Sequence, residues 1–336
     1  MNFSRSDRNL IQTLRGVLPA DIVHLEDHDH DLAMIRIGTT VLQAAWLPHG
    51  WPQELREVLV RHPAVDLVVA PRLSSASRQI ASDARVGWAD ATGGAEILKG
   101  SIVVSRTGTA GASWKPSGWT KSAIATAEAV LSGANATVDA AADATGLSTG
   151  GVASALRFLT REGLLEADAS RGRNAARRVR DWSALLAAYT VATEVRSNPD
   201  AVSIGVRWSD PLAEAGLIGE AWTSHGRRWA ATGAMAAAIL APYQTEVAPL
   251  EMYVDAGDPS QMELAAREVG LRPIEGGRLT LRSFPLDATA NLSSRHGNLI
   301  CAPWPRVFVD LRHAGVRGED AADHLRNVML ENRPER

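Results

Sequence analysis

Apolar residues recur along the middle of the chain with a spacing that predicts two helices joined by a tight turn. The first predicted helix covers residues 138–145, and Gly146 supplies the turn because glycine adopts positive φ without steric cost. The second begins after Ser148, whose hydroxyl can cap its first turn. Its apolar residues fall at i, i+3, i+4 and i+7, which places them on one face: Val152, Ala155, Leu156 and Leu159.

The other face of the second helix combines small or polar side chains with arginines. Short side chains at the start of a recognition helix permit close approach to the major groove, where its first residues meet base edges. Six residues are therefore candidate DNA contacts: Ser148, Thr149, Gly150, Ser154, Arg157 and Arg161.

A hairpin rich in arginine is predicted after Gly163, which ends the helical pattern. Arginines on a protruding hairpin suit contact with phosphates or insertion into a narrow minor groove. An arginine run by itself is as readily a solvated face, but next to a helix-turn-helix it favours a winged helix-turn-helix that binds DNA. A winged helix used for protein contacts is the alternative. The hairpin adds five candidate DNA contacts: Arg171, Arg173, Asn174, Arg177 and Arg178.

Helix and strand patterns alternate on both sides of this motif, and they predict an α+β multidomain chain. We expect an N-terminal α/β domain over 1–112, the winged helix-turn-helix over 113–195 and a C-terminal α/β domain over 196–336. The N-terminal pattern is also similar to that of a restriction-endonuclease-like fold. In the C-terminal domain, residues 230–243 predict a buried core helix and residues 306–311 a strand.

Composition narrows the setting of this motif. The chain has 336 residues and a formal net charge of −3, so its positive charge is local to the hairpin and does not coat the whole surface. A single cysteine, Cys301, leaves no internal disulfide framework and fits a reducing cytoplasm. Neither a signal-peptide core nor an apolar run of about 18 residues is present, so we expect a cytoplasmic protein without membrane contact.

The N-terminal domain also offers the residue types of a metal-dependent nuclease, which needs two acids and a lysine converging on a metal ion. The candidates are Asp66, Asp90, Glu96 and Lys99. Glu96 and Lys99 are three residues apart, so they fall on opposite faces of a strand. We therefore expect no enzyme, and a scaffold for DNA contact, dimerisation or ligand sensing instead. A metal-dependent nuclease is the alternative.

A second candidate for metal chemistry is the segment HLEDHDHD over residues 24–31. His28 and His30 alternate on one face of a strand, but no distant Cys or His signature completes a tetrahedral set. We expect a solvated turn there, and no metal or other cofactor. Gly-rich phosphate loops and the patterns G-x-S-x-G and H-E-x-x-H are also missing from the sequence.

Three blocks flank the central motif: VDLVVAPRLSSASRQIASDARVGWADATGGAEI, RRWAATGAMAAAILAPY and VFVDLRHAGVRGEDAADHLR. In this order around a winged helix they resemble the AbiEi-like bacterial transcriptional regulators, a group named for the antitoxins of type IV toxin-antitoxin systems. The resemblance covers most of the chain. It implies a DNA-binding repressor or autoregulator, with antitoxin activity where a neighbouring nucleotidyltransferase toxin exists. Many antitoxins of the group carry the winged helix at the N-terminus, whereas here it is central.

Pattern, charge and resemblance together predict a transcriptional regulator that binds duplex DNA sequence-specifically. We expect a repressor or autoregulator that acts as a homodimer, with double-stranded DNA as its main partner. A toxin protein or a small signal is a further candidate partner. An antitoxin that binds a nucleotidyltransferase-type toxin and the nuclease described above are the alternative functions.

Overall fold

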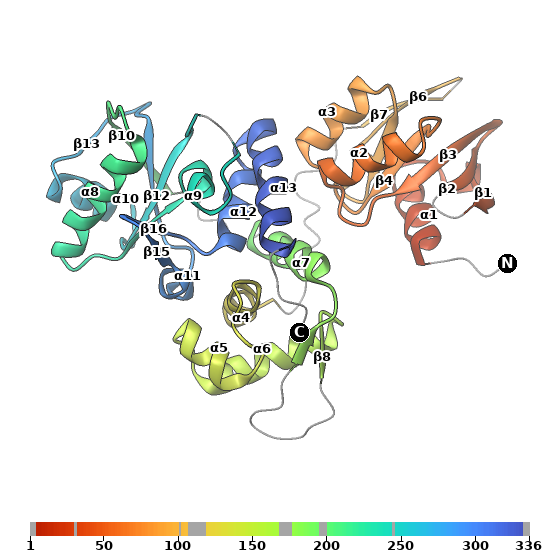
Figure 1. Cartoon of the computed structure of the whole chain (residues 1–336). Coiled ribbons are helices and arrows are strands. Elements are labelled where there is room, and N and C mark those ends of the chain that lie inside the picture. The colour runs from red at the N-terminus through yellow and green to blue at the C-terminus, as the bar shows by residue number, and fades with distance from the viewer. Residues whose placement is uncertain are drawn as a thin grey trace. The chain divides into compact units, whose positions relative to one another are not determined.

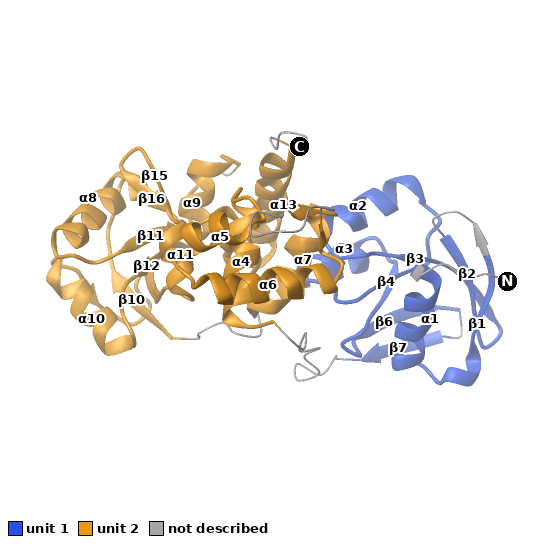
Figure 2. Cartoon of the chain, turned by 90° about the horizontal axis from the view of Figure 1, so that it is seen from below, with its two compact units in different colours: residues 1–114 blue, residues 115–336 orange. Residues whose placement is uncertain are grey.

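A computed structural model describes residues 5–29, 32–100, 102–106, 119–167, 177–194, 200–243 and 246–331 (Figure 1). The chain is α+β and consists of two compact units, residues 1–114 and residues 115–336 (Figure 2). The second unit contains residues 196–336 and all of 113–195 except residues 113 and 114. The boundary expected near residue 195 therefore does not separate two compact units.

The first unit is built on one mixed sheet whose strands lie in sequence order, from β1 to β7. Neighbouring strands pair antiparallel except β3 with β4 and β4 with β5, which are parallel because helices α2 and α3 connect them as crossovers. The strands are β1 (Val23–Asp29), β2 (Leu32–Ile37), β3 (Thr40–Trp46), β4 (Leu67–Ala70), β5 (Gly87–Asp90), β6 (Ala95–Lys99) and β7 (Ile102–Arg106).

Three helices cover the two faces of this sheet: α1 (Arg5–Val17), α2 (Pro52–Arg61) and α3 (Ser75–Asp83). Leu10 and Leu14 of α1 pack in one core with alternate residues of the strands, and Leu55 of α2 packs in a second core with the residues between them. The Ser74 hydroxyl caps α3 by accepting a hydrogen bond from the Ser77 amide at 3.0 Å.

The second unit begins with three helices and a short antiparallel strand pair, here called the three-helix module: α4 (Lys121–Leu131), α5 (Val138–Thr145), α6 (Thr149–Arg161), β8 (Leu165–Ala167) and β9 (Arg177–Val179). The turn between α5 and α6 is as predicted, with Gly146 at φ 71°. Ser148 caps α6 by accepting a hydrogen bond from the Gly151 amide at 3.2 Å. Helix α7 (Trp182–Glu194) follows and packs on α4.

The rest of the second unit is a mixed sheet in the order β13-β10-β14-β12-β11-β16-β15. Its strands are β10 (Ala201–Gly205), β11 (Trp229–Thr232), β12 (Leu250–Val254), β13 (Arg272–Pro273), β14 (Leu279–Ser283), β15 (Ser294–His296) and β16 (Leu299–Cys301). Helices α8 (Pro211–Ser224) and α10 (Pro259–Glu268) lie together on one face (Figure 1), where the Trp222 indole donates a hydrogen bond to the Ala265 carbonyl at 2.7 Å.

Four further helices complete this region: α9 (Gly233–Leu240), α11 (Asp287–Leu292), α12 (Trp304–Arg312) and α13 (Gly315–Glu331). Helices α9, α12 and α13 pack against one another. Helix α12 also contacts α4 and α7, and α11 contacts α4 and α5, so α11 and α12 join the C-terminal region to the three-helix module. These contacts explain why both belong to one compact unit.

One predicted element of the C-terminal region is wrong, and a second is confirmed only in part. Residues 306–311 belong to helix α12 and do not form a strand. Every residue from 304 to 311 is buried, so the segment lacks the polar face that distinguishes a helix from a strand in sequence. The predicted core helix over 230–243 begins as strand β11 and becomes helical only at Gly233, whose φ of 53° changes the direction of the chain.

A buried polar network crosses the second unit. Arg306 and Asp310 of α12 form an ion pair with 7% and 8% of their side chains exposed, and Arg306 Nε lies 2.9 Å from Asp310 Oδ1. Asp310 Oδ2 accepts hydrogen bonds from the hydroxyls of Thr232 and Tyr253. The pair therefore links α12 to both β11 and β12.

The same network reaches the three-helix module. Glu128 of α4 is buried and accepts a hydrogen bond from the Tyr189 hydroxyl of α7 at 2.6 Å. Burial raises the pKa of the Glu128 carboxyl, and the hydrogen bond from Tyr189 and the positive charge of Arg306 oppose that rise. Arg306 is thus near a carboxylate of the module and paired with a carboxylate of the C-terminal region.

Candidate nucleic-acid interface

Helix α6 presents a continuous exposed face opposite its buried one. The predicted inward residues Val152, Ala155, Leu156 and Leu159 are all at most 3% exposed. The six predicted contacts on this helix and its cap are all exposed: Ser148, Thr149, Gly150, Ser154, Arg157 and Arg161. Because four of them recur at i, i+4, i+7 and i+11, they share one face of the helix, with the small residues at its start.

The two arginines of this face differ in their surroundings. Arg157 has no ion-pair partner within the described part of the chain, so its guanidinium is available to a ligand. Arg161 is held over the Phe158 ring at 5.5 Å, and its Nε lies 3.7 Å from the Glu162 carboxylate. A side chain that is 73% exposed gains little from such a pair, so Arg161 also remains accessible.

Only part of the predicted arginine-rich hairpin is described by the structure, namely the strand pair β8 and β9. Arg178 is exposed on β9, whereas Arg177 is half-buried and its amide donates to the Ala136 carbonyl at 3.3 Å. The Nε of Arg177 is buried as well, so this residue contributes less accessible charge than predicted. The other three predicted contacts, Arg171, Arg173 and Asn174, lie outside the described residues.

An acidic residue that the sequence prediction overlooked lies on the facing strand. Glu166 of β8 is directly opposite Arg178 in the strand register, and its carboxylate lies 3.6 Å from Arg180 Nε. Part of the positive charge of the strand pair is therefore balanced within the protein. Both side chains of the Glu166–Arg180 pair are at least 64% exposed, so the pair is weak and a phosphate can compete for the arginine.

Lys121 is a further basic residue of this surface that the sequence did not single out. It is the exposed first residue of α4, and the start of α4 packs against α6: Trp119 meets Phe158 edge to face at 5.5 Å. A Cβ built on Gly151 would lie 3.6 Å from the Ser122 hydroxyl, so the first turns of α4 and α6 are adjacent. Only the packing of the two helices reveals this proximity, because Lys121 lies 28 positions before the first residue of α6, Thr149.

Replacing Lys121 by alanine is expected to weaken duplex binding about equally for all sequences and to reduce the dependence of log K on log salt by about one phosphate contact. The folded protein keeps its stability, because the Lys121 side chain is exposed. Titrations of a labelled duplex at several salt concentrations measure this slope. An unchanged slope would place Lys121 outside the interface.

The acidic residues of the nuclease hypothesis are engaged in structural contacts in the first unit. Asp66 lies 2.7 Å from Lys99 Nζ, and its other oxygen accepts the Gln43 amide at 3.0 Å. Asp90 is fully buried, pairs with Arg78 at 2.8 Å and accepts the amide of Thr92 at 3.0 Å. Glu96 accepts hydrogen bonds from the side chains of Ser82 and Trp88, both at 3.3 Å. Asp66 and Lys99 are thus brought together, whereas Asp90 and Glu96 have other partners.

Residues 24–29 of the histidine-rich segment belong to strand β1 and do not form the expected turn. The Nε2 atom of His24 lies 2.9 Å from the Asp21 carbonyl, which fixes that ring at the start of the strand. His30 and Asp31 lie outside the described residues. Among the residues that are described, no three His, Cys, Asp or Glu side chains form a group that could hold a metal ion.

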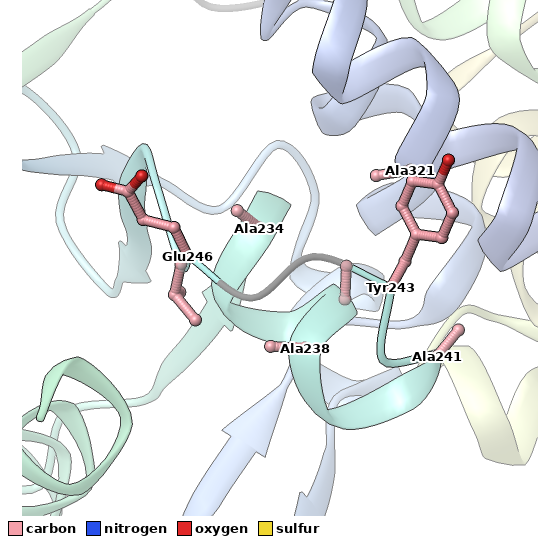
Figure 3. A pocket seen from close by; sticks show the side chains of 8 residues that line it. Ala234, Ala238, Ala241, Tyr243, Glu246 and Ala321 are labelled. Carbon is pink, nitrogen blue, oxygen red and sulfur yellow. The ribbon is translucent and has the colours of Figure 1, made fainter.

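A small pocket lies between α9 and α13 and is lined mostly by alanine methyl groups (Figure 3). Tyr243 lies beside Ala321 at one end, and Glu246 lies at the other. Its volume of about 10 Å³ suits one water molecule and falls far below the ~300 Å³ of typical ligand pockets.

Burial raises the pKa of the Cys301 thiol to about 12, so this cysteine stays protonated at neutral pH.

Comparisons of the whole chain with protein-family models, with curated proteins and with solved structures find no match. No helix in the described segments is long and apolar enough to cross a membrane.

Proposed function

We propose that the protein is a transcriptional regulator that binds duplex DNA through the three-helix module, acting as a winged helix-turn-helix. The observation that carries the proposal is the exposed face of α6, on which small residues precede Arg157 and Arg161 while the opposite face is buried. A helix of 13 residues is about 20 Å long, which matches a recognition helix lying in the major groove.

The proposed roles of the side chains follow from their positions. Thr149 and Gly150 form the first turn of α6, where close approach of the backbone to base edges is possible. Arg157 lies two turns further on and has the planar geometry that recognises guanine. Arg178 and Lys121 lie outside α6 and suit phosphate contact, which fixes the orientation of the protein on the duplex.

Regulation is the class of activity that this arrangement favours. With a net charge of −3, the chain has its DNA-binding charge confined to a small surface, as expected of a protein that selects particular sites. The resemblance to AbiEi-like regulators supports repression or autoregulation within that class. We further propose a homodimer, because two modules one helical turn apart on DNA bind a pseudo-palindromic operator.

Replacing Arg157 by alanine is expected to cost about 1–3 kcal/mol of specific binding, which is a loss of about fivefold to 150-fold, and to relax the preference at one base pair. Arg178→Ala is expected to weaken binding to all sequences alike and to lower the salt slope. Titration of duplexes selected by the wild type, together with single-base variants of them, separates the two effects.

The matched control is Arg267→Ala, which removes an exposed arginine of α10 that pairs with Glu263 four residues before it. This variant changes the net charge by the same amount but leaves the proposed interface intact. If all three arginine variants weaken binding equally, the interaction follows net charge alone and the assignment of α6 as the reading helix is wrong.

A further inference from the structure

In two helices of the three-helix module, a carbonyl group at the C-terminal end accepts a hydrogen bond from a side chain of the C-terminal region. The Leu131 carbonyl, at the end of α4, accepts from the Trp304 indole at 2.7 Å. The Thr145 carbonyl, at the end of α5, accepts from the Asn291 amide at 3.0 Å. The last carbonyls of a helix have no partner within the helix, so these bonds satisfy acceptors that would otherwise need water or a local cap.

The orientation of the Asn291 side chain is determined by its two neighbours. Its Oδ1 accepts from Arg228 Nη1 at 3.4 Å, while its Nδ2 faces the Thr145 carbonyl. The reverse orientation would put an NH₂ group against a guanidinium and an oxygen against a carbonyl. Arg228 is itself held by Asp255 at 3.0 Å and by Asp287 at 2.9 Å, so the amide is presented to the turn in one orientation.

The carbonyl that Asn291 binds lies at the turn that sets the direction of α6. Gly146 follows Thr145 with φ 71°, and a Cβ built on it would lie 2.7 Å from Asn291 Nδ2. The Leu147 amide donates to the Thr145 hydroxyl at 3.3 Å, and Ser148 then caps α6. Only three residues therefore separate the Asn291 contact from the first turn of the proposed reading helix.

We propose that Asn291 is a positioning residue for DNA recognition: from the C-terminal region it fixes the α5–α6 turn and thereby the angle at which α6 enters the groove. This inference rests on the proposed function of α6. Arg228 contributes indirectly, because it orients the amide of Asn291. The C-terminal region thus contributes to sequence selection without touching DNA, since a displacement of the reading helix by about 1 Å is enough to misplace its contacts.

The test is Asn291→Asp, which keeps the shape of the side chain and its acceptor for Arg228 but replaces the donor to Thr145 by an oxygen. Expected results are a loss of specific DNA affinity of about tenfold, an unchanged salt slope, and about tenfold faster hydrogen exchange at the Gly146 and Leu147 amides. The control is Asn298→Asp, the same chemical change at an exposed asparagine in the turn between β15 and β16, which is expected to change each of these quantities less than about threefold.

A second variant, Arg228→Gln, removes the group that orients the Asn291 amide without adding a negative charge at the turn. It is expected to give a smaller loss of specific DNA affinity. Thermal unfolding of each variant shows whether the fold is kept. A variant that keeps its fold but shows wild-type affinity and wild-type exchange at the turn overturns the inference. If the wild type does not select any duplex, the proposed function fails, and the exchange rates at Gly146 and Leu147 still decide whether Asn291 fixes the turn.

Discussion

Replacing Asp310 by alanine is expected to lower the free energy of unfolding of the second unit by about 3–5 kcal/mol, because removal of one partner leaves a buried charge without compensation. The Arg306 side chain is only 7% exposed, and the Asp310 carboxylate also accepts from the hydroxyls of Thr232 and Tyr253. Its loss therefore leaves one guanidinium and two hydroxyls without their acceptor. Urea unfolding followed by tryptophan fluorescence measures the change in free energy.

Two comparisons test this explanation. Glu263→Ala removes an exposed i,i+4 pair with Arg267 and is expected to cost at most about 0.5 kcal/mol. The double replacement Arg306→Met with Asp310→Leu removes both charges together and is expected to recover most of the stability lost in Asp310→Ala. A loss in Asp310→Ala no larger than that in Glu263→Ala would show that the buried pair does not stabilise the second unit.

Replacing Gly150 by glutamate is expected to reduce duplex binding by about a hundredfold or more while leaving the protein folded, because a carboxylate at the start of α6 faces the phosphates and the electronegative base edges. Nothing lies within 4 Å of a Cβ built on Gly150, so the new side chain meets no steric obstacle. A negative charge in the first turn of a helix also interacts favourably with its dipole. Loss of binding in this variant is therefore separate from loss of fold.

Gly150→Ala is the matched control. It adds a methyl group in the same open space, raises helix propensity by about 1 kcal/mol and brings no charge. We expect binding within a few-fold of the wild type and a slightly higher melting temperature. Duplex titrations and thermal unfolding of the three proteins give both quantities. Wild-type affinity in Gly150→Glu would place the start of α6 outside the interface.

Local signals in the sequence are sufficient to predict helices α5 and α6 and the turn between them. Ser148 and Gly146 determine a cap and a turn through their own backbone and side-chain chemistry, and the spacing of Val152 to Leu159 determines which face is buried. Such signals need no knowledge of the rest of the chain. This explains why the ends of α5 and α6 agree with the sequence prediction.

Elements that depend on distant partners were harder to predict. The α12 segment is buried on all sides, because α4, α9 and α13 surround it, and its pattern was therefore mistaken for a strand. Strand β11 exists because β12 and β16 pair with its two edges, and neither partner is apparent from the alanine-rich sequence around Gly233. The polar contacts of Asn291 and Trp304 with the module are equally long-range.

For the candidate interface, sequence predicted the exposed residues of α6 but not their surroundings. The sequence predicts Arg177 and Arg178 alike as DNA contacts, yet alternation along β9 leaves Arg177 half-buried. Glu166 opposes Arg178 only because strands β8 and β9 pair in one particular register. Lys121 joins the surface only because α4 packs on α6. Side-chain accessibility and neighbours arise from packing, which the local pattern does not contain.

Selection of duplexes from a random-sequence library, performed in parallel with the wild type and with Gly150→Glu, tests the proposal of sequence-specific DNA binding most directly. We predict that the wild type enriches a common sequence, with an affinity that falls as salt is raised, and that Gly150→Glu enriches none. Enrichment of the same sequence by both proteins, or of no sequence by the wild type, would contradict the account.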